Sequence, residues 1–371
     1  MKTERRYDID WIRVIVFDIL IIFHVGMFFS PWEWHIKNNE IVNWLNYPMG
    51  FTSYWRIPIL FIVSGMGTRF AFSNKTGKSY IYERISRLFL PLIVGMLIVV
   101  PPQVYLERLT QGLDFHNYFD FYPHYFEGVY PSGNFSWHHL WFLPYLLLMS
   151  IVATPLFLYL RKEKRFLVEK FKSLINKYSV SLYLLIVPFI PIELLFENKS
   201  MTHALFGDWY ALVFYFVFFI SGYLLISIKS SFWNAVIRIR HLTLIIGVLS
   251  FSIIVIFDIN RLIFSMVKIV NIWSWILAIF GFAAKYLNRQ SSLIKYRNKA
   301  VYPFYILHQT ITIICGYFLI NIDLHYSLKM AIMIVATFGG SWLIYEFIIL
   351  KIPIIQPLFG VKRIKTIANK A

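Results

Sequence analysis

"RVIVFDILIIFH", residues 13–24, is an apolar stretch that carries three ionisable side chains, Arg13, Asp18 and His24. It lies within a longer apolar run, residues 11–30, which has about the 20 residues that a helix needs to cross a hydrocarbon core. An ionisable group inside a membrane is energetically costly and by default marks a functional site. The stretch therefore predicts a membrane-spanning helix with a function beyond anchoring.

The composition of the whole chain is that of a polytopic membrane protein. Of its 371 residues, 58% are hydrophobic and 15% are charged, whereas a soluble domain has about 25% charged residues. The single cysteine, Cys315, excludes an internal disulfide and argues against a cysteine-based metal cluster. The first apolar run is long and no small-residue cleavage site follows it, so we expect an anchor and not a cleaved signal.

Hydropathy predicts an all-α bundle of about ten transmembrane helices, which form one integral-membrane domain over residues 1–371 and surround a central cavity. The predicted helices are 11–30, 54–72, 88–106, 139–160, 178–195, 209–228, 242–257, 262–284, 300–320 and 330–350. The second is the weakest prediction. Arg56 and Arg69 leave only about 12 uncharged residues between them, against the 20 or so that a span needs.

The distribution of basic residues predicts that both termini are cytoplasmic. With the N-terminus inside, 28 of the 36 Lys and Arg residues fall in inner segments and seven in outer loops or outer helix ends. Such a bias is the usual signature of orientation. The net charge of +17 is therefore explained by topology and anionic lipid in a cytoplasmic (inner) membrane, and we expect no nucleic-acid partner.

Arg13 and His24 are predicted to share one helix face. Eleven residues at about 100° each end about 20° beyond three full turns, roughly 16 Å along the axis. Asp18 lies about 140° away from Arg13, and we favour a structural bond to another helix for it. A purely structural interpretation stays open for the other two, with Arg13 held by Asp10 at the helix end and His24 bonded to a neighbouring helix.

His308, in "YPFYILHQT" (302–310), is the other histidine well inside a predicted span. Its predicted depth differs from that of His24 by about 7 Å, so the two are expected to line one cavity. No third ligand has a recognisable spacing, and the adjacent pair His138–His139 has the same weakness. We therefore expect no metal site.

Glu346 and Arg13 lie at similar depths in the tenth and first predicted helices, so they are a candidate intramembrane ion pair. Arg56, near the outer end of the second helix, either extends its charge to the interface or meets an acidic group. Arg84 and Arg87 precede the third helix at positions i and i+3. Guanidinium groups suit phosphates, although the positive-inside bias explains these two equally well.

The longest predicted outer loop, residues 107–138, is rich in aromatic and acidic residues. Aromatic rings at this depth are typical of an interfacial belt. The alternative is a platform for a sugar, since flat rings cover the apolar faces of pyranoses.

These elements together favour acyl transfer across the membrane. Basic groups inside suit a phosphate-bearing donor, and His24 would take the proton of an external hydroxyl group while that oxygen attacks a thioester. An export or flipping role for a glycan or lipid precursor is the alternative, because transporters also carry intramembrane charges. The absence of an internal repeat in the sequence counts against transport.

Several motifs in the chain resemble those of the membrane acyltransferase 3 family, in the order in which the family carries them. They are the Arg13-x10-His24 spacing, "LFIVSGMGTRF" (60–70), "ERISRLFLP" (83–91), "HHLWFLPYLLL" (138–148) and "YPFYILHQT" (302–310). The resemblance spans nearly the whole chain. It implies transfer of an acyl group from cytoplasmic acyl-CoA to an extracytoplasmic carbohydrate, with no permanently bound cofactor.

Three further segments resemble the branch that decorates periplasmic glucans with succinyl groups: "WEWHIKNN" (32–39), "WRIPILFIVSG" (55–65) and "LIYEFIILKIPIIQPLFG" (343–360). The resemblance implies an O-acetyl- or O-succinyltransferase with a glucan acceptor. It assigns catalysis to His24 and His308, with Arg13 as the signature partner. Acyl-CoA is then expected at Arg13, Arg84 and Arg87, and substrate contacts at Trp34, His35, Arg56, Trp141 and Glu346.

Overall fold

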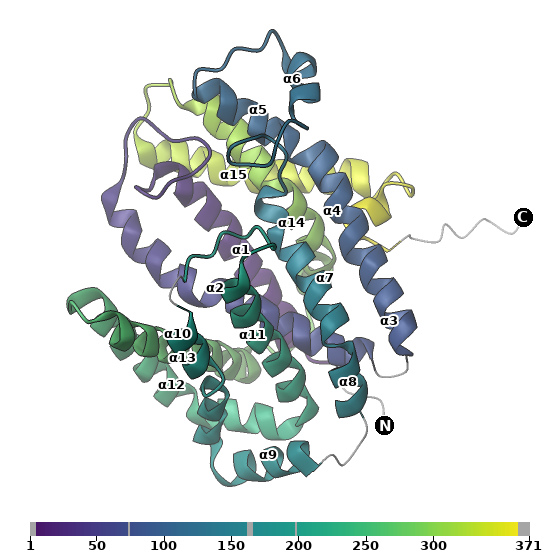
Figure 1. Cartoon of the computed structure of the whole chain (residues 1–371), viewed down its shortest axis with the longest axis vertical. Helices are drawn as coiled ribbons and strands as arrows, with labels where there is room; N and C mark the ends of the chain where they lie inside the picture. The colour runs from purple at the N-terminus through teal and green to yellow at the C-terminus, as the bar shows by residue number, and fades with distance from the viewer. Residues whose placement is uncertain (1–4, 73–74, 162–165, 197–198, 363–371) are drawn as a thin grey trace, which may run out of the picture. The chain divides into compact units, whose positions relative to one another are not determined.

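The computed structural model describes residues 5–72, 75–161, 166–196 and 199–362, and these are helical almost throughout (Figure 1). Within these ranges the only β-type pairing is an isolated bridge between Val129 and Phe135. The α-helices are α1 (Tyr7–Phe29), α2 (Asn46–Ala71), α3 (Gly77–Arg84), α4 (Leu90–Val94), α5 (Pro101–Thr110), α6 (Tyr118–His124), α7 (Phe142–Val152), α8 (Thr154–Leu160), α9 (Phe166–Lys177), α10 (Phe189–Leu195), α11 (Trp209–Ser227), α12 (Ser230–Ile256), α13 (Arg261–Tyr286), α14 (Ser292–Leu319) and α15 (Tyr326–Ile344). The prediction of an all-α protein is confirmed.

Shorter helical segments of other types connect these helices. The 3₁₀ segments are η1 (Asn43–Leu45), η4 (His138–Trp141), η5 (Ser179–Ile186) and η7 (Gln356–Phe359). The π-helical segments are η2 (Ile85–Phe89), η3 (Gly95–Val99) and η6 (Tyr345–Ile349).

Six helical stretches in the described part of the chain are long and apolar enough to cross a membrane. They are Tyr7–Phe29, Gly77–Thr110, Trp209–Ser227, Ser230–Ile256, Arg261–Tyr286 and Tyr326–Ile349. A seventh forms if His138–Val152 and Thr154–Leu160, which meet at a 54° bend, are one span. The chain is therefore an integral membrane protein, while the count of ten spans and the cytoplasmic termini stay predictions.

Proline explains where two predicted helices are interrupted. The stretch predicted as 178–195 consists of η5 and α10, which are separated near Pro188. The stretch predicted as 139–160 bends before α8, whose first turn contains Pro155. Proline lacks the backbone N–H and clashes with the preceding turn, which disfavours a continuous α-helix at these two positions, although α2 and α14 continue through Pro58 and Pro303.

The contacts divide the chain into two compact units. The first comprises Met1–Val16, Gly50–Glu83 and Tyr145–Asn298, and the second comprises Phe17–Met49, Arg84–Pro144 and Lys299–Ala371. Because α1 continues from one unit into the other, Arg13 belongs to the first unit and His24 to the second.

The first unit depends on close contacts between helix backbones. A Cβ atom on Gly65 of α2 would lie 2.0 Å from the carbonyl oxygen of Phe219, and one on Gly222 of α11 would lie 2.0 Å from that of Ile62. Glycine at both positions thus allows α2 and α11 to cross at close range. In the same unit α12 and α13 pack along their length as a helical hairpin (Figure 1).

The second unit has a hydrophobic core around the end of α1. Its fully buried members include Val25, Phe28 and Phe29 of α1, Ile313 of α14 and Met333 of α15. Val25 follows His24 directly, so this packing fixes the turn of α1 that carries the histidine. Burial of apolar surface contributes about 25 cal/mol of folding free energy per Å², so this core stabilises the helices around it.

Candidate functional site

His24 and His308 meet in the second unit. The Nδ1 atom of His24 lies 2.7 Å from the Nε2 atom of His308, and the two rings stack with centroids 5.0 Å apart and planes 10° apart. His308 is fully buried and His24 is half-buried. The two histidines singled out in the sequence thus form one hydrogen-bonded pair.

The backbone around His308 determines how protons are distributed in this pair. The Nδ1 atom of His308 lies 2.7 Å from the carbonyl oxygen of Tyr305 and 3.2 Å from that of Phe304. Carbonyl oxygens only accept hydrogen bonds, so Nδ1 carries the proton and Nε2 of a neutral His308 is the acceptor. His24 therefore donates through Nδ1–H, and its Nε2 atom is the basic nitrogen.

His139 supports the backbone of the same turn of α14. Its Nε2 atom donates to the carbonyl oxygen of Ile306 at 2.9 Å, and the hydroxyl group of Tyr305 donates to the carbonyl oxygen of His139 at 2.5 Å. The rings of His139 and His308 are perpendicular, with centroids 5.1 Å apart. These contacts hold the His308 ring in its orientation.

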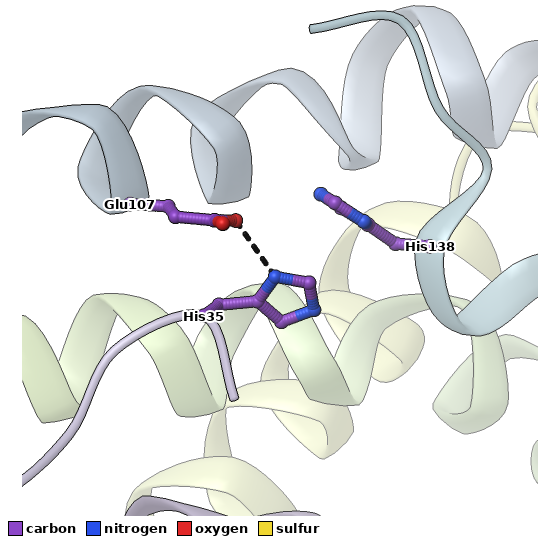
Figure 2. A group of neighbouring side chains, drawn as sticks. All are labelled: His35, Glu107 and His138. Atoms are coloured by element: carbon purple, nitrogen blue, oxygen red, sulfur yellow. Dashed lines mark hydrogen bonds and ion pairs between the residues drawn. The ribbon is translucent and has the colours of Figure 1, made fainter. Parts of the chain in front are cut away.

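A second polar cluster lies in the same unit and consists of His35, Glu107 and His138 (Figure 2). His35 comes from the loop after α1, Glu107 from α5, and His138 from the start of η4. The Nδ1 atom of His35 donates to Oε2 of Glu107 at 2.7 Å, and the ring of His138 lies 4.2 Å from that of His35. The Glu107 carboxylate is 3% exposed, so it depends on these neighbours for its stabilisation.

Tyr130 completes the environment of Glu107. Its hydroxyl group donates to Oε1 of Glu107 at 2.9 Å. Burial and the neighbouring carboxylate raise the pKa of Tyr130 above its ordinary value, so the phenol remains a proton donor. Arg108, the next residue of α5, donates instead to Asn134 and to the carbonyl oxygens of Pro131 and Gly133, and so fixes the loop that carries Tyr130.

The first unit contains a basic cavity of about 290 Å³ beside α1. Its polar lining consists of Arg5, Arg6, Asp10 and Arg13, and its apolar lining consists of Ile9, Val63, Gly67 and Phe70. Arg13 donates to Oδ1 of Asp10 at 3.1 Å and to the side chain of Asn298. Arg5 and Arg13 both pair with Asp10, whereas Arg6 pairs with Asp8. The lining itself holds three guanidinium groups and one carboxylate, and this excess of positive charge suits an anion.

The remaining predicted site residues are distributed over both units. In the second unit Trp34 is half-buried beside His35, with ring centroids 5.7 Å apart, and Trp141 ends η4. Glu346 is half-buried in η6. In the first unit Arg56 is buried in α2. The proposed pair of Glu346 with Arg13 stays a prediction.

The two arginines before the third predicted helix stand at a change of helix type. Arg84 is the last residue of α3 and is half-buried, whereas Arg87 is exposed within η2. A π-helix has i→i+5 hydrogen bonds, which alter the angular spacing that positions i and i+3 have in an α-helix. The hydroxyl group of Tyr302 donates to the carbonyl oxygen of Arg87 at 3.0 Å.

Three residues that form hydrogen bonds in these clusters were not predicted from the sequence: Glu107, Tyr130 and Asn298. Glu107 stands at the boundary of a predicted helix and loop, where an acidic residue carries no distinct signal. Tyr130 was one of many aromatic residues in the loop, and Asn298 one of many polar residues before a span. Only the spacing of charge along α1 gave a local signal, and it pointed to Arg13 and His24.

The sequence of the chain is similar to those of known proteins. A profile of the acyltransferase domain of the membrane acyltransferase 3 family matches residues 6–346. Glucans biosynthesis protein C of Escherichia coli O157:H7 is 23% identical over 392 residues, covering 98% of this chain and 96% of that protein. The proteins of the same name from Shigella dysenteriae and Escherichia coli K12 are 24% identical, and these matches cover 44% of this chain and 42% of each relative. No solved structure matches the chain.

Proposed function

Because the chain belongs to the membrane acyltransferase 3 family, we propose that it transfers an acyl group from cytoplasmic acyl-CoA to a hydroxyl group of an extracytoplasmic glucan, with His24 as the general base. The observation that carries this proposal is the hydrogen bond between His24 and His308. It makes Nε2 of His24 the basic nitrogen, and an acyl transferase without a serine or cysteine nucleophile requires such a base.

In the proposed chemical step one atom, Nε2 of His24, first accepts a proton and later donates it. Nε2 of His24 removes the proton of the acceptor hydroxyl group while the oxygen attacks the thioester carbonyl carbon. The C–S bond breaks when the tetrahedral intermediate collapses, and the sulfur of CoA takes the proton from the His24 imidazolium. His308 keeps the ring of His24 in the productive tautomer, which is the role of the third group in hydrolase triads.

The basic cavity of the first unit suits the donor. CoA carries phosphate groups, and guanidinium groups bind phosphates through paired, charge-assisted hydrogen bonds. Arg13 lines this cavity and stands on the same helix as His24. We propose that Arg5, Arg6 and Arg13 of the first unit bind phosphates of acyl-CoA in this cavity. For Arg84 and Arg87 of the second unit we propose phosphate binding separately.

The acceptor class rests on the relatives and on aromatic side chains of the second unit. The relatives carry the name glucans biosynthesis protein C. Trp34 and Trp141 are half-buried, and indole rings cover the apolar faces of sugars. We propose that Trp34, His35 and Trp141 contact the glucan, and that Arg56 and Glu346 contribute to substrate binding, Arg56 by pairing with the carboxylate of a succinyl group.

The transport alternative is not favoured, because the acyltransferase profile spans nearly the whole chain. The test is an assay of the purified protein in membranes with labelled acetyl-CoA and succinyl-CoA and a periplasmic-type glucan. We expect release of free CoA and labelled glucan with one of the two donors. A glucan that crosses the membrane without gaining the mass of an acyl group would contradict the proposal and support transport.

A further inference from the structure

We propose that His35, Glu107 and His138 form a binding site for one divalent transition-metal ion, with Zn²⁺ as the best fit. One nitrogen of each histidine and one carboxylate oxygen lie within 4.8 Å of one another. Figure 2 shows the three side chains converging from the α1–η1 loop, α5 and the start of η4. Imidazole and carboxylate ligands in a set of three are a recurrent ligand set for zinc.

His138 gives the first independent argument for a ligand. Its Nε2 atom is buried and has no hydrogen-bond partner among the described residues. A buried polar atom without a partner costs free energy, about 1–3 kcal/mol, unless something binds it. Its other nitrogen lies 3.3 Å from the hydroxyl oxygen of Ser136, so the ring has a partner that orients it.

The carboxylate of Glu107 gives the second argument. It is 3% exposed, and a buried carboxylate is stabilised by hydrogen bonds, by an ion pair or by a bound metal ion. Arg108 makes its hydrogen bonds to Gln111, Asn134 and loop carbonyl oxygens instead. Tyr130 holds Oε1 of Glu107 at 2.9 Å, and this leaves Oε2 toward the two histidines.

The distances require only small side-chain movements. Tetrahedral zinc with bonds of about 2.0–2.1 Å separates its ligand atoms by about 3.3 Å. The present separations range from the 2.7 Å between His35 and Glu107 up to the 4.8 Å limit of the cluster. An ion at Nδ1 of His35 would take the place of the proton in the hydrogen bond to Glu107, and the neutral ring would then carry its proton at Nε2.

The backbone conformation at His138 also favours a histidine at this position. His138 has φ of 41°, in the left-handed region where histidine and asparagine are tolerated better than most residues. Tyr130 on Glu107 and Ser136 on His138 act as the outer partners that orient metal ligands and whose loss weakens metal binding about 10- to 100-fold. Three protein ligands leave one tetrahedral position for water or a hydroxyl oxygen.

The test uses the full chain without a polyhistidine tag, purified in the absence of chelators. Zn²⁺ content after desalting and the visible absorption of bound Co²⁺ are measured for wild type, His138→Asn and Glu107→Gln. The matched control is His124→Asn, because His124 forms an exposed pair with Glu127 at 2.9 Å outside the cluster. Asparagine also accepts the backbone conformation at position 138.

We expect one Zn²⁺ per wild-type and His124→Asn chain, and at least about a tenfold loss of affinity in the other two variants. Circular dichroism and size-exclusion profiles equal to those of wild type exclude misfolding as the cause. A wild-type protein that holds no metal would overturn the proposal, as would variants that bind Zn²⁺ as tightly as wild type. This result is independent of the acyl-transfer assay, so either proposal can fail without the other.

Discussion

The Nδ1 atom of His24 lies 2.7 Å from the Nε2 atom of His308, and the backbone carbonyl oxygens beside His308 fix which atom carries the proton. The residues are 284 positions apart in the sequence. This pair joins α1 and α14 within the second unit, and in our proposal His24 is the base and His308 its positioning residue.

Replacing His308 tests the positioning role. His308→Leu removes the acceptor that holds Nδ1–H of His24, so we expect kcat to fall about 10- to 100-fold while KM for acyl-CoA changes little. The pH–rate profile is expected to shift as well, because the tautomer and basicity of His24 both depend on this bond. The control is His116→Leu, which makes the same change at an exposed histidine. An unaltered pH profile with a reduced rate would point to a merely structural role.

Arg13 tests the proposed donor cavity. Arg13→Gln removes one of three guanidinium groups that line it, so KM for acyl-CoA is expected to rise about tenfold, equivalent to about 1.4 kcal/mol of binding. Arg261→Gln, at the exposed start of α13, removes the same charge elsewhere. If both substitutions changed KM equally, or neither did, the cavity would not be the donor site.

Substitutions at the crossing of α2 and α11 test whether the two helices of the first unit pack at close range. Gly65→Ala and Gly222→Ala each place a methyl group about 2 Å from a backbone oxygen of the other helix. We expect each to destabilise the protein by roughly 1–3 kcal/mol or more, because backbones cannot move apart locally. Gly50→Ala in the same helix α2 meets nothing within 4 Å and is expected to be neutral or slightly stabilising. Equal thermal midpoints for all three variants would contradict the close crossing.

His203 provides a pH-dependent prediction in the loop before α11. Burial lowers the pKa of His203 to about 4, from 6.5 for an exposed histidine, although Asp208 opposes the change. Between pH 6.5 and 4 the unfolded chain therefore binds a proton that the folded protein does not, and stability falls as pH falls. The limiting loss is roughly 3 kcal/mol, since one pKa unit corresponds to about 1.4 kcal/mol.

The matched variant is His203→Asn, which cannot titrate here and tolerates the φ of 58° at this position. Thermal midpoints at pH 7 and pH 4.5 are compared for the two proteins. Wild type is expected to lose more stability than the variant over this interval. Parallel losses would mean that His203 titrates normally in the folded protein.

Local sequence patterns predicted the helices well, because an apolar run of membrane length has few alternatives. Helical segments occupy most of each of the ten predicted ranges, while six stretches of the described chain, or seven with the bent pair, are long and apolar enough to cross a membrane. The prediction of continuous helices was wrong at 139–160 and 178–195, where Pro155 and Pro188 interrupt them. The predicted start at residue 88 was also late, since a helical stretch runs from Gly77 to Thr110.

The candidate site was predictable where ionisable residues stand inside predicted helices, as His24 and His308 do. Arg13 and His24 stand in α1 as the spacing predicted, and the bond from Arg13 to Asp10 follows from their i, i+3 spacing. Glu107 and Tyr130 meet His35 through loop conformation and long-range packing, which no periodicity encodes. The metal site proposed for His35, Glu107 and His138 was therefore not expected from the sequence.

The most direct test of the central claim compares wild type with His24→Ala in membranes supplied with glucan and labelled acetyl-CoA or succinyl-CoA. Release of CoA and formation of acylated glucan are both followed, with folding checked by size-exclusion profile. We predict that wild type uses one donor and that His24→Ala loses at least about a hundredfold in kcat. A folded His24→Ala protein with wild-type turnover would contradict the assignment of His24 as the base.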